Sequence, residues 1–209
     1  LEASGRKAPP AELTLGDELR APGGAKLGLG GSACASVAVV AAALTVAGED
    51  VGARRDLVFK LAAVAHGRAQ GKVGSALDVA ASTFGGTLWT WRFDVQALLA
   101  AWGAGCGPFA RAVDATACPD REVLPSPAGL LLAFSGQSAS TASLVGKVEE
   151  YARRDPSGFA EFVAHTSNLT DGLRRALWVA DLPGAAAALA GAGQQLERLG
   201  LLPRARQRG

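Results

Sequence analysis

The sequence predicts an α+β fold in two domains. Two segments, Thr87–Phe93 and Leu130–Phe134, have strand character, and the segments around them carry apolar residues at helical spacing. Residues 103–128 are rich in Gly, Pro and Asp, a composition typical of a connection between domains. We therefore expect a first domain over residues 1–125 and a second over residues 126–209.

The composition indicates a packed globular protein and excludes several classes. Of the 209 residues, 49% are hydrophobic, and 21 basic against 19 acidic residues leave a net charge of only +2. Three cysteines are too few and too scattered for a disulfide framework, and no metal-binding spacing of Cys or His is present. No apolar run reaches the ~20 residues of a membrane-spanning helix, and no signal peptide is visible. We expect a cytoplasmic protein that binds neither nucleic acid nor membrane.

The first domain is expected to place helices around one aromatic strand. Ser32 is of the type that caps a helix start, and Trp89, Trp91 and Phe93 alternate onto one side of their strand, which predicts a buried aromatic face. The expected elements are a possible short strand at residues 13–15, helices over residues 32–47 and 54–70, a short helix ending at residue 83, and a strand over residues 87–93.

The second domain is expected to begin with the buried strand Leu130–Phe134. The strand runs into a loop of small residues, Ser135–Ser140. Apolar spacing and stop residues then predict three helices, over residues 141–154, 157–179 and 184–199.

A glycine-rich loop at the start of the first helix is a candidate phosphate-binding site. Glycines let the backbone approach an anion closely, and the free N–H groups of a helix start favour a phosphate there. An ordinary glycine-rich turn capped by Ser32 explains the same residues equally well. The candidate residues are Gly28, Leu29, Gly30, Gly31, Ser32 and Ala33.

A second candidate site lies between Gln70 and Asp78. Asp78 could accept a proton from an attacking oxygen, and Lys72 could neutralise phosphate charge. Ser75 and Asp78 also have the spacing of a capping box, which would fix a helix start and nothing more, and from the residues alone this is the commoner explanation. His66, on the preceding helix, is expected to be solvated or hydrogen-bonded in place rather than catalytic.

The third candidate site is the loop before the helix at residue 141. Backbone amides and the hydroxyls of Ser138, Ser140 and Thr141 could bind an anionic group of a substrate. The alternative is a flexible Ser/Gly turn in which Thr141 caps the helix.

These three loops, in this order, resemble one family. Residues 28–33, Gly-Leu-Gly-Gly-Ser-Ala, are similar to the phosphate loop G-L-G-S-S-A of the GHMP kinases. Residues 69–81, Ala-Gln-Gly-Lys-Val-Gly-Ser-Ala-Leu-Asp-Val-Ala-Ala, resemble the stretch A-Q-G-K-V-G-S-G-F-D-V-A-A of the phosphomevalonate kinase branch. Residues 136–148 are similar to the family's G-S-x-x-S-T-x-x-L-V-x-K-V segment.

The resemblance implies an ATP-dependent small-molecule kinase that uses Mg²⁺ and phosphorylates 5-phosphomevalonate to 5-diphosphomevalonate in isoprenoid synthesis. It implies a first domain like ribosomal protein S5 and a ferredoxin-like second domain. The roles it implies are Asp78 and Lys72 in catalysis, residues 28–33 in ATP binding, Ser32 near Mg²⁺, and Ser75, Ser138, Ser140 and Thr141 in substrate binding.

The chain departs from the family pattern at identifiable places. Gly31 stands where the phosphate loop has its first serine, and Ala76 replaces a glycine before the aspartate. The N-terminal P-G-K-V-x-L-x-G-E-Y and C-terminal S-G-A-G-G-G-D motifs and any methionine are lacking, which indicates an internal segment of a longer protein. Another GHMP enzyme (mevalonate kinase or diphosphomevalonate decarboxylase) and a non-catalytic nucleotide- or metabolite-binding homologue remain alternatives. The resemblance leaves open whether the protein is a monomer or a homodimer.

Overall fold

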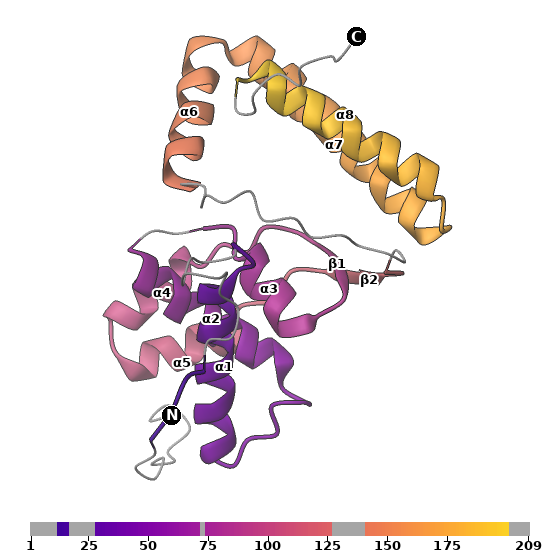
Figure 1. Ribbon diagram of the computed structural model, residues 1–209. Helices are drawn as coiled ribbons and strands as arrows, with labels where there is room; N and C mark the ends of the chain where they lie inside the picture. Colours follow the sequence, from indigo (N-terminus) through magenta and orange to yellow (C-terminus); the bar gives the residue numbers. More distant parts are fainter. Residues whose placement is uncertain (1–11, 17–27, 72–73, 127–140, 201–209) are drawn as a thin grey trace. The chain divides into compact units, whose positions relative to one another are not determined.

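The chain forms two compact units, Leu1–Val123 and Leu124–Gly209. The computed structural model describes residues 12–16, 28–71, 74–126 and 141–200 (Figure 1). This part of the chain is mostly helical with one two-stranded sheet, so it holds less β structure than the predicted α+β fold. None of its helices combines the length and the apolar character that crossing a membrane requires.

The first unit consists of five helices and a β ribbon, counted over the described residues. Its elements are α1 (Gly31–Val46), α2 (Arg55–Gln70), α3 (Leu77–Phe84), β1 (Thr87–Thr90), α4 (Gln96–Gly103), α5 (Cys106–Ala115) and β2 (Arg121–Leu124), which pairs with β1.

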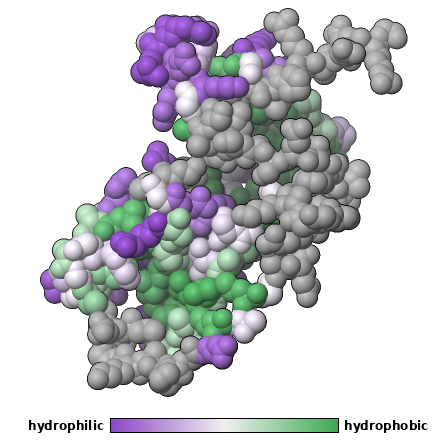
Figure 2. Space-filling model, turned by 60° about the vertical axis from the view of Figure 1, so that its left-hand side comes forward, coloured by the Kyte–Doolittle hydropathy of each residue, from purple (hydrophilic) through white to green (hydrophobic). Residues whose placement is uncertain are grey.

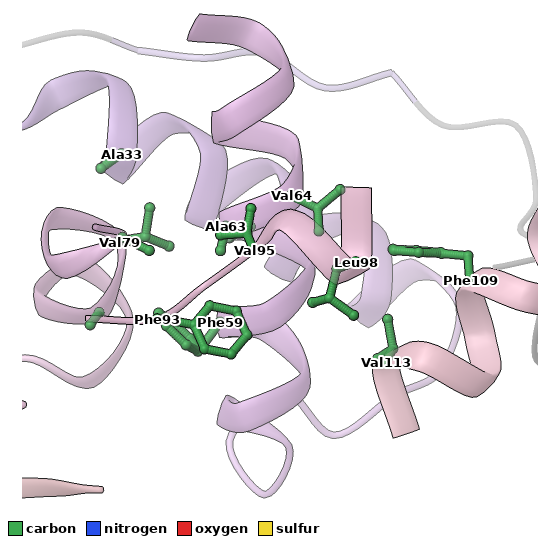
Figure 3. Packing of buried hydrophobic residues seen from close by; sticks show 13 residues of the cluster. Ala33, Phe59, Ala63, Val64, Val79, Phe93, Val95, Leu98, Phe109 and Val113 are labelled. Atoms are coloured by element: carbon green, nitrogen blue, oxygen red, sulfur yellow. The ribbon is translucent and has the colours of Figure 1, made fainter. Parts of the chain in front are cut away.

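One apolar core joins all five helices of this unit. Phe59 of α2 is fully buried at its centre, with ring centroids 5.6 Å from Phe84 and 5.0 Å from Phe93. Figure 3 shows Phe59 and Phe93 side by side, with Val79 of α3 on one side and Leu98 of α4 on the other. Because these side chains come from α2, α3, α4 and the segment that follows β1, the core fixes α2 and α3 relative to each other.

Several expectations for the first unit are wrong. Residues 12–16 form no strand. The aromatic strand ends at Thr90, so Trp91 is 54% exposed, whereas Phe93 is buried as predicted. The partner strand β2 is only four residues long, and a strand cannot extend past its hydrogen-bonding partner.

The segment predicted as a connection contains ordered structure. Within residues 103–128, α5 places Phe109 and Val113 in the core, and β2 completes the ribbon. Pro108 lies in the first turn of α5, where the missing N–H costs no hydrogen bond. Reading Gly and Pro as a linker was therefore wrong for α5.

The second unit contains three helices in its described part: α6 (Thr141–Arg154), α7 (Pro156–Trp178) and α8 (Leu182–Arg198). Asp155 and Asp181 cap α7 and α8, accepting from the backbone N–H of Gly158 at 2.9 Å and Gly184 at 3.0 Å. All three helices confirm the predicted ones to within two residues. The predicted strand Leu130–Phe134 lies outside the described residues.

Helix α1 has apolar residues on all its sides, and many of these residues lie outside the buried core. Ala33 and Leu44 are buried, but much of the remaining helix is half-exposed, and Val46 is exposed. Figure 2 shows an apolar area on the surface of the first unit, in the lower part of the view. Among the described elements, the helix is held mainly by its contacts with α2 and α3.

Candidate active site

The start of α1 is open toward solvent. Gly30 precedes the helix in the left-handed conformation, with φ 76° and ψ 23°, and its carbonyl accepts from the N–H groups of Ala33 and Cys34. No side chain among the described residues caps this helix start. The prediction that Ser32 is the cap is wrong, because the left-handed turn at Gly30 lets the helix begin at Gly31.

This geometry suits an anion. Gly28 and Gly30 both have φ near +76°, and no other atom of the described structure lies within 4 Å of a Cβ built on either. Leu29 and Ser32 are exposed, whereas Ala33 is buried and anchors the turn. Free N–H groups and the positive end of the helix dipole therefore point into open space.

The start of α3 carries Asp78 without a capping box. The residue before the helix is Ala76, also left-handed (φ 57°), and no described side chain caps this end. Asp78 Oδ1 instead accepts from the N–H of Val79 at 2.9 Å. The capping explanation of the Ser75–Asp78 spacing is therefore wrong, and the Asp78 carboxylate, 49% exposed, can face a ligand.

Polar side chains link α1 to the end of α2 at two levels. Gln70 Nε2 donates to Ser32 Oγ at 3.3 Å, and one turn further Ser36 Oγ lies 3.5 Å from His66 Nδ1. Ser32 and Ser36 are four residues apart on α1, and His66 and Gln70 are four residues apart on α2, so each pair lies on one face of its helix. The order of the partners is reversed between the helices, which shows that α1 and α2 run antiparallel here. Ser32, just inside the start of α1, is thus tied to α2.

His66 also joins the helices to Asp78. Its Nε2 lies 3.4 Å from Asp78 Oδ2, and its side chain is only 14% exposed. A second link runs through Ser82, whose hydroxyl lies 3.3 Å from Cys34 Sγ and donates to the Asp78 carbonyl at 2.8 Å. The described residues of the first and second predicted loops are therefore brought together in the structure.

The expectation that His66 is hydrogen-bonded in place is confirmed, since its two nitrogens face Ser36 and Asp78. No pattern in the sequence indicates these two partners, which lie 30 residues before His66 and 12 residues after it.

Other predicted site residues are placed less fully. Ser75 is half-buried just before α3, and its carbonyl accepts from the Phe93 N–H at 3.1 Å. Thr141 begins α6, in the second unit. Lys72, Ser138 and Ser140 lie outside the described residues.

The thiol of Cys118 lies beside Asp56 and packs against the apolar core of the first unit. Burial raises the pKa of its thiol, and the neighbouring Asp56 carboxylate raises the pKa further. Its Sγ lies 3.7 Å from the Asp56 carbonyl oxygen. A raised pKa favours the protonated thiol, which is a poorer nucleophile than the thiolate.

A divalent cation would find only a few protein oxygens here. Among the described residues, no three His, Cys, Asp or Glu side chains gather into a metal cluster. Mg²⁺ typically takes one or two protein oxygens and completes its shell with water and substrate phosphates. The exposed Ser32 hydroxyl fits that arrangement.

Comparison with known proteins agrees with this geometry. Residues 2–86, which carry both loops, match the family model described as GHMP kinases N terminal domain. This segment is a GHMP kinase N-terminal domain.

The chain is also distantly homologous to phosphomevalonate kinases over most of its length. It is 32% identical over 202 residues to the phosphomevalonate kinase of Streptomyces sp. (strain CL190), which covers 93% of this chain and 51% of that protein. It is 41% identical over 87 residues to the phosphomevalonate kinase erg8 of Aspergillus fumigatus, covering 40% of this chain and 18% of that protein.

A solved structure has a similar fold. The crystal structure of a Lin0012 protein from Listeria innocua matches with a TM-score of 0.70 and 25% identity, over 88% of this chain and 51% of that one. The chain therefore spans about half the length of the Streptomyces and Listeria proteins.

Proposed function

We propose that this chain contains the nucleotide-binding and catalytic part of a phosphomevalonate kinase. The observation that carries the proposal is the Asp78 carboxylate, half-exposed, held at both oxygens and linked through His66 and Ser36 to the helix that begins at the phosphate loop. Residues 1–125 and 126–209 are then the N-terminal and C-terminal GHMP domains, the second in its part present here.

The proposed reaction is transfer of the ATP γ-phosphoryl group to an oxygen of 5-phosphomevalonate. The bond from the γ-phosphorus to the β-phosphate oxygen breaks, ADP leaves, and a bond to the acceptor oxygen forms. Asp78 orients that oxygen and takes its proton when it carries one. Positioning and charge neutralisation supply most of the catalysis in such transfers.

Other residues of the chain have supporting roles. The N–H groups at the start of α1 and the Gly28–Gly30 backbone bind the ATP phosphates. Ser32 would hold Mg²⁺, which when bound offsets phosphate charge. Lys72 acts on the same charge, and Ser75, Ser138, Ser140 and Thr141 contact the substrate.

The direct test is ADP release by the complete natural protein with three acceptors: mevalonate, 5-phosphomevalonate and 5-diphosphomevalonate. We expect turnover with 5-phosphomevalonate and none above background with mevalonate. Turnover with mevalonate alone would make the protein a mevalonate kinase. ADP and CO₂ release from 5-diphosphomevalonate would make it a decarboxylase. Nucleotide binding without any turnover would identify a non-catalytic homologue.

Gly30→Ala is expected to weaken ATP binding at least tenfold. The new Cβ would project where the phosphates are proposed to lie. It would not collide with the protein itself, because no other described protein atom lies within 4 Å of its position. Left-handed backbone at a residue other than glycine also costs about 1–2 kcal/mol. The measurement is nucleotide affinity by titration calorimetry, together with the melting temperature.

Gly48→Ala is the control for backbone strain, because Gly48 has φ 83° beyond the opposite end of α1. It should lower the melting temperature similarly and leave nucleotide affinity unchanged. Equal affinity of the Gly30→Ala variant and the natural protein would remove the phosphate loop from the site.

A further inference from the structure

The imidazole of His66 bridges two helices through both of its nitrogens. Nδ1 lies 3.5 Å from Ser36 Oγ on α1, and Nε2 lies 3.4 Å from Asp78 Oδ2 on α3. The ring is 14% exposed, whereas Asp78 is 49% exposed. One side of the carboxylate therefore faces the histidine while the rest stays accessible.

The hydrogen-bond directions follow from the Ser36 hydroxyl. Ser36 Oγ lies 3.0 Å from the Ser32 carbonyl oxygen, a closer acceptor than His66 Nδ1. A hydroxyl carries a single proton, so a hydroxyl that donates to Ser32 accepts from Nδ1–H of His66. With Nδ1–H of His66 donating to Ser36 of α1, Nε2 faces Asp78, and it donates to the carboxylate in the imidazolium form, which carries a proton on each nitrogen.

The carboxylate of Asp78 is then restrained at both oxygens. Oδ1 accepts from the Val79 N–H within α3, and Oδ2 faces His66 Nε2 from α2. Two restraints from two different helices fix the rotation of the carboxyl group, which a single bond within α3 would leave free. An exposed carboxylate without them would sample several rotamers.

We propose that His66 is a positioning residue, which holds the Asp78 carboxylate in its reactive orientation through the Nε2–Oδ2 contact. The proposal rests on the proposed function, in which Asp78 acts on the acceptor oxygen. His66 itself touches neither substrate nor nucleotide in this scheme, so its loss should lower kcat and leave both Michaelis constants nearly unchanged.

Two amide substitutions separate the two nitrogens of the ring. In His66→Gln the side-chain amide can reach the place of Nε2 and donate to Asp78 Oδ2. In His66→Asn the shorter amide replaces Nδ1 and keeps a partner for Ser36 but falls short of Asp78. Both variants are polar and neutral, but asparagine is the poorer helix former, so the melting temperature of each variant is measured beside its kinetics to separate a loss of stability from a loss of positioning.

The experiment measures kcat, both KM values and the melting temperature of the complete protein for the two variants. We expect kcat within about threefold of the natural value for His66→Gln and at least tenfold lower for His66→Asn, a difference of about 1.4 kcal/mol in barrier. Both KM values should change less than about twofold in either variant, as expected when only the transition state is affected.

Three outcomes would overturn the inference: equal kcat for the two variants, a larger loss for His66→Gln, or a change confined to KM. A natural protein that releases no ADP with any acceptor would overturn the proposed function and this inference together. Full activity in the natural protein with equal kcat in the two variants would overturn this inference alone.

A third variant is needed if His66→Asn has a much lower melting temperature than His66→Gln. Ser36→Ala removes the partner of Nδ1 and leaves the ring in place. We expect this variant to lower kcat and to leave both KM values unchanged. An unchanged kcat in that variant would also contradict the proposal.

Discussion

Asp78→Asn is expected to lower kcat by about 10²–10⁴-fold, the usual effect of losing a general base. The asparagine keeps the side-chain shape and an oxygen that can accept from Val79 N–H, as Oδ1 does at 2.9 Å. It loses the negative charge and the capacity to take a proton, and an amide nitrogen facing His66 cannot replace Oδ2. The melting temperature should stay close to that of the natural protein, because Asp78 does not form the capping box.

The control for this variant is Asp94→Asn. Asp94 is also exposed, and its Oδ1 likewise accepts a backbone N–H, that of Gln96, at 2.9 Å. The same chemical change there should leave kcat unchanged. A clear drop in melting temperature for Asp78→Asn with kcat within about threefold would assign Asp78 a structural role only, since a barrier change of ~0.65 kcal/mol is too small for a lost base.

The residues of the proposed site could be named from the sequence, but the contacts between them could not. From the residues alone the loops at Gly30 and Asp78 are ambiguous, and the resemblance to the GHMP kinases singles them out. The link between them depends on Ser36 and His66, which lie 30 residues apart in sequence and 3.5 Å apart in space. Local patterns do not contain such a pairing, since it arises from helix packing.

Helix starts show why local chemistry can mislead. Ser32 and Ser75 are good capping residues, yet α1 and α3 both begin after a left-handed residue, Gly30 or Ala76. For Gly30 this conformation carries no steric penalty, whereas for Ala76 it is strained. The buried Ala76 is held there by the core, so tertiary packing overrides the capping preference.

The fold was predictable where apolar spacing was long and uninterrupted. Helix α6 begins and ends at the predicted residues, and α2 differs by one residue. Helix α5 was missed because Gly105, Gly107 and Pro108 dominate its first turn, although Phe109 and Val113 already supply an i, i+4 apolar pair. Short strands such as β2 depend on a distant partner, and four residues carry too little pattern to identify one.

Phe59→Ala is expected to reduce the stability of the first unit by about 3–5 kcal/mol, the range for removing a buried aromatic ring. The Phe59 side chain is fully buried, and its ring packs against Phe84 and Phe93 at centroid distances of 5.6 and 5.0 Å. A small domain is stable by only about 5–15 kcal/mol, so this loss removes a large share of the total. The effect also concerns the site, because Phe59 and His66 lie two turns apart on one side of α2.

The measurement is amide hydrogen exchange of the complete protein, read segment by segment. We expect exchange in α2 and α3 to quicken by about 10²–10³-fold, the equivalent of 3–4 kcal/mol at ~1.4 kcal/mol per decade. Peptides from α7 and α8 belong to the other unit and should keep their natural rates. Leu77→Ala, at a residue 44% exposed, is the surface control and should cost less than about 1 kcal/mol. Unchanged protection of α2 in Phe59→Ala would show that the aromatic cluster does not hold α2 to α3, and the restraint on His66 and Asp78 would then need another source.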